Sequence, residues 1–330
     1  MTHPDLSLTA RPALVRDELV AVEALIELLT ESRASLVPQV RRHLLQAGGK
    51  RLRPALTITC AKALGEPNER TTLLAACVEM VHTASLLHDD VVDDADRRRG
   101  VPSANRRWSN TAAVLCGDWL VATASDALAR HGEHDALRVL SAAVVRMCEA
   151  ELRQLEDTAD PWSITEEECL GVIQGKTAAL IAAACDLGAL SVEAPPEQRE
   201  AVHHYGRLLG TAFQIVDDVL DIIGDPQALG KPVGTDVTIG QPTLPLVCAL
   251  RRAAGDLLRR VEDAVRSGLP DEAGLQLLHG LVLEAGGVEG AQAIAKEHVE
   301  GAVAALDVLP ASSAKQALLA LAEAVLTRSS

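Results

Sequence analysis

The chain has 330 residues, which is enough for one large domain or two ordinary ones with a full hydrophobic core. Its net charge of −15 argues against general binding to nucleic acid or to an anionic membrane. Only 2% of the residues are aromatic, so Ala, Leu and Val have to fill the interior, and Ala and Leu favour helices.

The N-terminal region and the cysteines predict a cytoplasmic protein. The first positions carry Asp5, Arg11, Arg16, Asp17 and Glu18, so they lack the apolar core of a signal peptide. The seven cysteines show no CxxC spacing, and scattered thiols suit a reducing compartment. No uncharged apolar stretch reaches about 18 residues, so we expect no transmembrane segment.

The fold class predicted from the periodicity is all-α. Apolar positions recur at every third and fourth residue, and Gly and Pro divide the chain into ten or more helices. Ser163-Ile164-Thr165-Glu166 predicts a capping box that opens one of them. No low-complexity linker divides the chain, so we predict a single domain over residues 1–330. The longest interruption, Gly224 to Pro245, is typical of a lid or binding loop.

The first candidate site in chain order is the basic turn from Gly48 to Pro54. A Gly pair ends one helical region, and Pro54 suits the first turn of the next. Lys50, Arg51 and Arg53 stand between them, at a helix start where free backbone N–H groups also attract anions. The turn is either a solvated basic turn or, beside acidic clusters, a phosphate clamp.

The first acidic cluster is Asp89-Asp90-Val91-Val92-Asp93, in an apolar run from Val81 to Val92. Asp89 and Asp93 share a helix face one turn apart, and such like charges oppose helix formation by roughly 0.2–0.5 kcal/mol per pair. His82 lies two turns before Asp89 on nearly the same face. A hard divalent cation would compensate the charge, and Mg²⁺ in particular binds through one or two carboxylates while sharing substrate phosphates.

A run of basic residues follows this cluster. Asp94 and Asp96 lead into Arg97-Arg98-Arg99-Gly100, so metal and phosphate could be held side by side. The alternative is a basic helix C-terminus that is closed by glycine, which explains where the arginines stand but not the excess of aspartates.

A second acidic cluster of the same form, Asp217-Asp218-Val219-Leu220-Asp221, lies in the apolar run from Leu208 to Ile223, with Gln214 on its face. Lys176 and Thr177 interrupt an apolar helix, where a lone charge either snorkels to solvent or serves a cavity.

A rival interpretation is a di-iron helical bundle. Glu79-Met80-Val81-His82 and Glu200-Ala201-Val202-His203 both have the Glu-x-x-His spacing that such bundles use. This spacing is common by chance in helices, and it would leave both aspartate clusters and the clustered cations unexplained.

The ordered set of motifs resembles the trans-type polyprenyl (isoprenyl) diphosphate synthase family. The resemblance implies a bundle of mostly antiparallel helices around a deep central cavity, paired as a homodimer. It also implies condensation of an allylic diphosphate with isopentenyl diphosphate, with three Mg²⁺ ions per active site. The motifs that carry it are Gly48-Gly49-Lys50-Arg51, His88-Asp89-Asp90, Gly117-Asp118, Gly175-Lys176-Thr177, Phe213-Gln214-Ile215-Val216-Asp217-Asp218, Gly230-Lys231-Pro232 and Thr243-Leu244-Pro245.

The same resemblance implies roles for individual residues. The metal ligands would be Asp89, Asp93 and Asp217, assisted by Asp90, Asp218 and Asp221. Isopentenyl diphosphate would be held by Lys50, Arg53, His82 and Arg99. The allylic diphosphate would be bound by Arg98, Lys176 and Lys231, with Thr177 and Gln214 facing the allylic carbon. The released diphosphate takes the proton in this family, so we expect no side chain as catalytic base. The chain departs from the pattern at Gln241, where many members carry Lys, and at Ala150, where Gly is usual.

Product length in this family is governed by the cavity floor, just before the first cluster. Ala84 and Ser85 stand where short-chain members often place an aromatic residue, and Cys77, Val78 and Ala124 also leave room. We therefore expect a long product, a quinone side-chain precursor of octaprenyl class, with transient membrane contact for its release. The alternatives are a geranylgeranyl or farnesyl diphosphate synthase, a class I terpene cyclase, and a non-catalytic synthase subunit. Cyclases usually lack the second cluster and the basic clamp, and such subunits typically lose one aspartate cluster.

Overall fold

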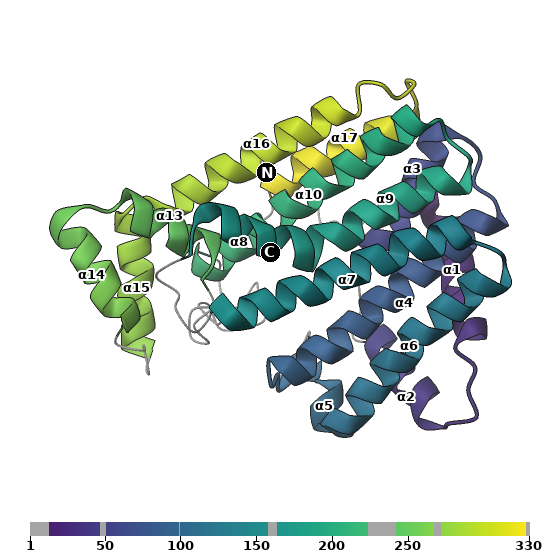
Figure 1. Cartoon of the computed structure of the whole chain (residues 1–330), viewed down its shortest axis with the longest axis horizontal. Coiled ribbons are helices and arrows are strands. Elements are labelled where there is room, and N and C mark those ends of the chain that lie inside the picture. The colour runs from purple at the N-terminus through teal and green to yellow at the C-terminus, as the bar shows by residue number, and fades with distance from the viewer. Residues whose placement is uncertain are drawn as a thin grey trace, which may run out of the picture. The chain divides into compact units, whose positions relative to one another are not determined.

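The computed structural model describes residues 13–46, 51–98, 100–157, 164–223, 242–266 and 272–327, and it confirms the all-α class (Figure 1). Among these residues the only strands are two of two residues each, paired antiparallel as β1 (Arg97–Arg98) and β2 (Val101–Pro102). The helices up to the hairpin are η1 (Ala13–Val15), α1 (Arg16–Leu29), α2 (Leu36–Gln46), α3 (Leu52–Leu64) and α4 (Glu69–Val92). After it come α5 (Ala104–Arg107), α6 (Asn110–Arg130), α7 (His134–Asp157), α8 (Glu166–Ile173), the π-helical turn η2 (Gln174–Ala178), α9 (Ala179–Ser191), α10 (Pro196–Ile223), α13 (Leu244–Arg252), α14 (Gly255–Arg266), α15 (Glu272–Glu284), α16 (Gly287–Ala305) and α17 (Ser313–Leu326).

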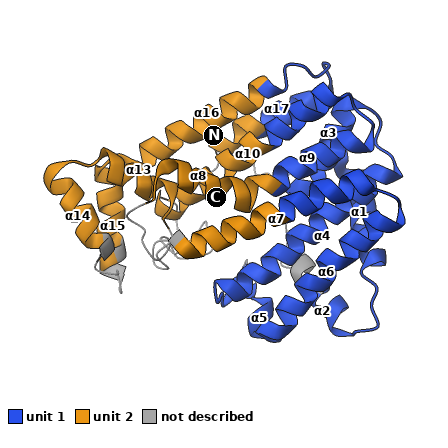
Figure 2. Cartoon of the chain, in the orientation of Figure 1, with its two compact units in different colours: residues 1–144, 180–206, 305–321 blue, residues 145–179, 207–304, 322–330 orange. Residues whose placement is uncertain are grey.

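The chain divides into two compact units, which Figure 2 colours separately. Unit 1 holds residues 1–144, 180–206 and 305–321, and unit 2 holds residues 145–179, 207–304 and 322–330. Each unit is assembled from three separate segments, so the chain passes between them several times. The single domain over residues 1–330 stays a prediction, and each unit is described by itself below.

Side-chain caps fix where two of the helices begin. Asn68 accepts a hydrogen bond from the Thr71 backbone N–H and donates its own N–H to the Thr71 hydroxyl, both at 3.1 Å, which opens α4. Thr165 and Glu168 make the same reciprocal pair at the start of α8. The predicted box from Ser163 to Glu166 was wrong, because Glu166 is the first residue of α8 and Glu168 is the partner of the cap.

Small residues let the helices of unit 1 approach closely. A Cβ atom added at Gly188 in α9 would lie 2.2 Å from the Thr57 carbonyl oxygen in α3. Beside this contact, the Thr57 hydroxyl donates to the Ala184 carbonyl at 2.9 Å. On the α10 side, a Cβ at Gly206 would lie 2.8 Å from the Ala182 Cα. Backbone contact of this kind explains how a chain with so few aromatic residues builds a dense core.

Gly188→Ala is therefore expected to lower the free energy of unfolding by about 1–3 kcal/mol, since the methyl group would force α3 and α9 apart. Gly171→Ala in α8 is the matched control, because a Cβ there meets no atom within 4 Å. That control should be neutral or stabilising by up to about 1 kcal/mol. Thermal unfolding of both variants tests the prediction, and equal unfolding temperatures would contradict the close packing.

Two helical stretches among the described residues, Asn110–Arg130 and Glu166–Ser191, are long and apolar enough to cross a membrane by length and composition. Buried core helices pass the same test, and 67% of the second window is buried within the protein.

Candidate active site

The first acidic cluster lies at the end of α4, in unit 1. The helix ends at Val92, as the sequence predicted, but it begins earlier, at Glu69. Asp93 is the C-cap and donates its backbone N–H to the Asp89 carbonyl at 2.8 Å. Asp89 is half-buried and Asp93 is exposed. The two carboxylates therefore stand one turn apart on an accessible face, as the spacing predicted.

Asp90 points the other way and is fully buried. Its Oδ1 accepts from Arg98 Nε at 2.7 Å, and its carbonyl accepts from Asn105 Nδ2 at 2.9 Å. Its Oδ2 is buried and has no hydrogen-bond partner among the described residues. Asp90 thus anchors the segment after α4 rather than extending the accessible face, and its predicted assisting role toward the metal stays a prediction.

The basic run after the cluster is a hairpin. Arg97 pairs with Pro102 and Arg98 with Val101, with Gly100 in the turn at φ 81°. The alternative of a basic helix C-terminus was wrong, because α4 ends before the run begins. Arg98 is held by Asp90, and Arg99 lies outside the described residues.

Two further aspartates of this region are neutralised locally. Arg106 contacts Asp94 at 2.9 Å and Asp96 at 2.7 Å, and its hydrogen bond to Asp94 is the main cause of the raised pKa of its guanidinium. The excess of aspartates therefore resolves into three parts. Arg98 engages Asp90, Arg106 engages Asp94 and Asp96, and Asp89 and Asp93 form the third part, on the more accessible side of the helix end.

His88 ties the first cluster to α6, which lies beside α4 (Figure 1). Its Nε2 lies 3.3 Å from the Val114 carbonyl oxygen and 3.4 Å from Asp118 Oδ1. A Cβ added at Gly117 would lie 2.2 Å from the same Nε2. The Gly117-Asp118 motif thus provides the space and the polar contact for the residue next to Asp89.

The two arginines of the basic turn before α3 have different kinds of partner. Arg53 Nη1 lies 3.0 Å from His82 Nε2, and since arginine only donates, Nε2 is the acceptor in this hydrogen bond. Arg51 instead turns to Glu79, at 3.0 Å, and to Glu23, at 3.4 Å. The interpretation of three clamp cations disagrees with the structure at Arg51, because two carboxylates hold its charge and its side chain is only 11% exposed. Lys50 lies outside the described residues.

These contacts count against the di-iron interpretation. Glu79 and His82 are each already engaged by an arginine at 3.0 Å, and within the described residues no group of three or more His, Cys, Asp or Glu side chains is placed to hold a metal.

The second acidic cluster lies on α10, in unit 2. This helix ends at Ile223, as predicted, although it begins at Pro196. Asp217 is half-buried, whereas Asp218 and Asp221 are buried. Thr177 Oγ1 donates to Gln214 Oε1 at 2.8 Å, and Gln214 Nε2 donates to Asp218 Oδ1 at 2.9 Å. The structure thus brings together three residues that the sequence singled out separately.

A π-helical turn presents Lys176 and Thr177. Such single turns are rare and occur frequently at functional sites. Lys176 Nζ lies 2.9 Å from Glu151 Oε1 and 3.3 Å from Gln154 Oε1, both on α7. A Cβ at Gly175 would lie 2.5 Å from the Ala150 Cβ, so the alanine that departs from the family pattern fills the space beside this glycine.

His279 on α15 is a residue that the sequence did not indicate. Burial lowers the pKa of its imidazole, while the charge of Asp221 acts in the opposite direction, so His279 lies within electrostatic reach of the second cluster. Its Nε2 is buried without a hydrogen-bond partner among the described residues. Glu151 and Gln154 were missed as well, since no short motif connects α7 with Lys176.

The residues before the first cluster have contrasting environments. Ala84 is fully buried. Ser85 is half-buried, one turn before Asp89, and its hydroxyl donates to the His82 carbonyl at 2.9 Å. Cys77 Sγ lies 3.7 Å from the Ala124 carbonyl, and burial raises the pKa of its thiol to about 12, so it remains uncharged in the core.

The donor set suits a hard cation that shares its ligands with a substrate. Within the ranges that the structure describes, no three or more His, Cys, Asp or Glu side chains form a metal site on their own. A carboxylate pair such as Asp89 and Asp93 fits Mg²⁺, which uses one or two carboxylates with substrate phosphates and water. Lys231 and Gln241 lie outside the described residues.

Comparisons with known proteins show the family to which the chain belongs. The family model described as "Polyprenyl synthetase" matches residues 34–277. The octaprenyl diphosphate synthase of Escherichia coli (strain K12) is 38% identical over 319 residues, which cover 96% of this chain and 97% of the relative. A short chain isoprenyl diphosphate synthase of Methanothermobacter thermautotrophicus is also 38% identical, over 92% of this chain and 94% of its own length. A crystal structure of polyprenyl synthase from Caulobacter crescentus CB15, complexed with calcium and isoprenyl diphosphate, superposes with a TM-score of 0.92 at 35% identity and covers 98% of both chains.

Proposed function

The chain belongs to the polyprenyl synthetase family and is a polyprenyl diphosphate synthase, and we propose that it makes a long-chain trans-polyprenyl diphosphate by Mg²⁺-dependent condensation of isopentenyl diphosphate with an allylic diphosphate. The observation that carries this proposal is the pair of aspartate clusters, each at the end of its helix, with cationic side chains beside it. A cyclase or a non-catalytic subunit accounts for fewer of these features.

The residues of unit 2 would act on the allylic substrate. Lys176 binds its diphosphate, and the proton of the Thr177 hydroxyl is committed to Gln214. The lone pairs of the Thr177 oxygen therefore remain available to the allylic carbon as positive charge develops on it. The hydrogen bond from Gln214 to Asp218 fixes the orientation of the amide, so this dipole is preorganised.

The residues of unit 1 would hold the second substrate. Arg53 and His82 bind isopentenyl diphosphate, while Arg98, aimed by Asp90, contributes to the allylic diphosphate. Asp89 and Asp93 of the first cluster, and Asp217 of the second, would hold Mg²⁺, which would neutralise the leaving diphosphate when bound. The calcium in the Caulobacter relative supports a divalent ion in this family. Asp218 and Asp221 complete the second cluster, and we retain the expectation of three ions per site.

A long product is supported by the residues at the expected cavity floor. Ala84, Ser85 and Cys77 are small, and Ala124 on α6 is small as well. The identity to relatives does not decide the length, because octaprenyl and short-chain enzymes are equally similar to this chain.

The test is incubation of the purified protein with isopentenyl diphosphate, Mg²⁺ and a series of allylic diphosphates, followed by sizing of the dephosphorylated products. We expect products of octaprenyl class and no turnover after removal of divalent ions with a chelator. Products that stop at geranylgeranyl or farnesyl length would reject the long-chain assignment, and cyclised products would reject the reaction itself.

We also propose that the protein is a homodimer through exposed apolar stripes. In unit 1, α6 exposes Leu115, Ala122 and Ala129 at seven-residue spacing. In unit 2, α7 exposes Val145 and Leu152 at the same spacing. Exposed apolar stripes of this kind mark contacts between proteins, and seven-residue spacing suits helix–helix packing.

Leu115→Glu is accordingly expected to raise the dissociation constant of the dimer at least about 10-fold, because it would bury a charge at the proposed interface between subunits. Leu28→Glu on α1 is the matched control, since Leu28 is 61% exposed and Leu115 is 62% exposed. Light scattering across a concentration series should show a dimer for the wild type and the control. A dimeric Leu115→Glu protein would contradict this interface.

A cytoplasmic location is part of the same proposal. All seven cysteines are free thiols and six of them are buried, which suits a reducing compartment. Cell fractionation should recover the protein with cytosolic markers, and recovery in an oxidising compartment would reject the location.

A further inference from the structure

Two polar contacts connect α4 with the start of α3, one an ion pair and the other a hydrogen bond. Glu79 and His82 stand one turn apart on α4, and each engages one arginine at 3.0 Å. Glu79 takes Arg51, and His82 takes Arg53. The family resemblance implies an isopentenyl diphosphate role for Arg53 and His82, but it implies none for the pair of Arg51 and Glu79.

The backbone of Arg51 is held in an unfavourable conformation. Its φ of 49° and ψ of 36° are left-handed, a region that residues other than glycine rarely adopt. Such conformations persist only where the surrounding structure determines them, and they cluster at functional sites. Arg51 is the N-cap of α3, so this single residue sets the direction in which the chain enters the helix that carries Arg53.

The contact that holds Arg51 is buried. The side chains of Arg51 and Glu79 are 11% and 6% exposed, and Glu23 adds a second carboxylate at 3.4 Å from Arg51 Nε. A carboxylate in this environment requires a cationic partner, and the planar guanidinium fork of arginine can hold two acceptors in fixed directions. The charge of Arg51 is therefore neutralised by carboxylates of the protein, so Arg51 does not bind a substrate.

We propose that Glu79 and Arg51 are positioning residues that set the affinity for isopentenyl diphosphate through Arg53 and His82 without touching the substrate. This inference rests on the proposed role of Arg53 and His82. Glu79 fixes the left-handed turn, and the turn fixes Arg53 at the distance from which it donates to His82. Displacement of a binding side chain by about 1 Å is enough to lower the rate up to about 100-fold.

The test is steady-state kinetics with each substrate varied separately. Glu79→Leu should raise the KM for isopentenyl diphosphate by about 10- to 100-fold and leave the KM for the allylic diphosphate within about threefold. Glu79→Gln should restore most of the affinity, because its amide oxygen still accepts from Arg51. Should Glu79→Leu fail to fold, Arg51→Gln decides, since it removes the charge but keeps a polar group, and it should raise the same KM about 10-fold.

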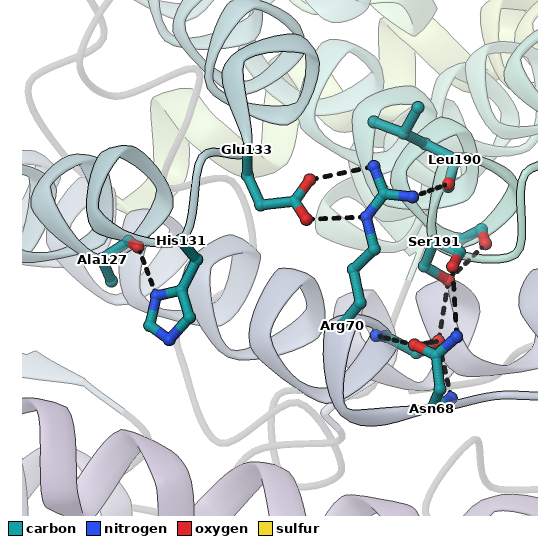
Figure 3. Close-up of polar contacts among 9 residues, drawn as sticks. Asn68, Arg70, Ala127, His131, Glu133, Leu190 and Ser191 are labelled. Atoms are coloured by element: carbon teal, nitrogen blue, oxygen red, sulfur yellow. Dashed lines mark hydrogen bonds and ion pairs between the residues drawn. The ribbon is translucent and has the colours of Figure 1, made fainter.

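The same helix offers a matched control. Arg70 on α4 makes an ion pair with Glu133 at 2.7 Å, and the Glu133 side chain is 13% exposed (Figure 3). Arg70 Nη1 also donates to the Leu190 carbonyl at 2.9 Å, which ties this pair to the end of α9 (Figure 3). Glu133→Leu removes a comparable Arg–Glu pair away from the basic turn, so it should lower thermal stability without changing either KM.

The outcomes separate the two proposals. An unchanged KM for isopentenyl diphosphate in Glu79→Leu or Arg51→Gln, while Arg53→Ala and His82→Ala raise it, would overturn the positioning role alone. If Arg53→Ala and His82→Ala also leave that KM unchanged, the binding site itself is assigned to the wrong residues. If Glu133→Leu also raised the KM for isopentenyl diphosphate, general destabilisation would explain the effect of Glu79→Leu, and the positioning role would be rejected.

Discussion

Asp89→Asn is expected to lower the condensation rate at least about 100-fold while leaving the folded state as stable as the wild type. The rate falls because one carboxylate of the accessible pair is lost where electrostatic stabilisation of the leaving diphosphate is needed. Stability is maintained because the substitution also removes like-charge repulsion with Asp93, worth a few tenths of a kcal/mol. Initial rates and thermal unfolding of the metal-free protein give the two measurements.

Asp90→Asn is the matched control one position along the helix. Asp90 is fully buried and accepts from Arg98 Nε at 2.7 Å, so loss of its charge should destabilise the fold by about 1–3 kcal/mol. Wild-type protein should gain thermal stability from Mg²⁺ and a diphosphate together, since ligands that bind only the folded state stabilise it. Asp89→Asn should lose this gain, and normal rates in that variant would rule out Asp89 as a metal ligand.

Ser85→Phe is expected to shorten the main product from octaprenyl class to geranylgeranyl length or below. Ser85 lies one turn before Asp89 on the same helix face and is half-buried, so a phenyl ring there would stand across the path of a growing chain. Product sizing by chromatography measures the effect. Ser85→Ala is the control, because it removes the hydrogen bond to the His82 carbonyl without adding bulk.

The neighbouring position gives a less clear experiment. Ala84 is fully buried, so Ala84→Phe would overpack its surroundings at a cost of about 1–3 kcal/mol and confuse folding with chain length. An unchanged product distribution in folded Ser85→Phe protein would show that the floor of the cavity lies elsewhere.

The sequence was sufficient for the fold class and for the ends of the two key helices. Apolar periodicity continues to Val92 and Ile223, where it stops because polar or turn-forming residues follow, and α4 and α10 end there. The starts were less predictable, since several caps compete. Ser163 and Thr165 each precede a glutamate by three residues, and the structure uses Thr165 as the cap.

The partners of charged residues could not be predicted from spacing. Arg51 and Glu79 are 28 residues apart. The sequence of the basic turn therefore indicated three cations, but it could not indicate which of them would make an ion pair with a carboxylate. The different environments of Asp89 and Asp90 could be predicted in part, because adjacent helical positions point about 100° apart. The hairpin at Arg97 could not be predicted, since strands of two residues are too short for an alternating pattern.

We propose that Mg²⁺-dependent binding of the allylic diphosphate requires both aspartate clusters, and a double-mutant cycle tests this proposal most directly. Mg²⁺-dependent binding of an unreactive allylic diphosphate analogue would be measured by calorimetry for the wild type, Asp89→Asn, Asp217→Asn and the double variant. Residues that share one ligand network are non-additive, so the double variant should bind little worse than either single variant. Losses that add within about 0.5 kcal/mol would show that the clusters act independently and would contradict the account.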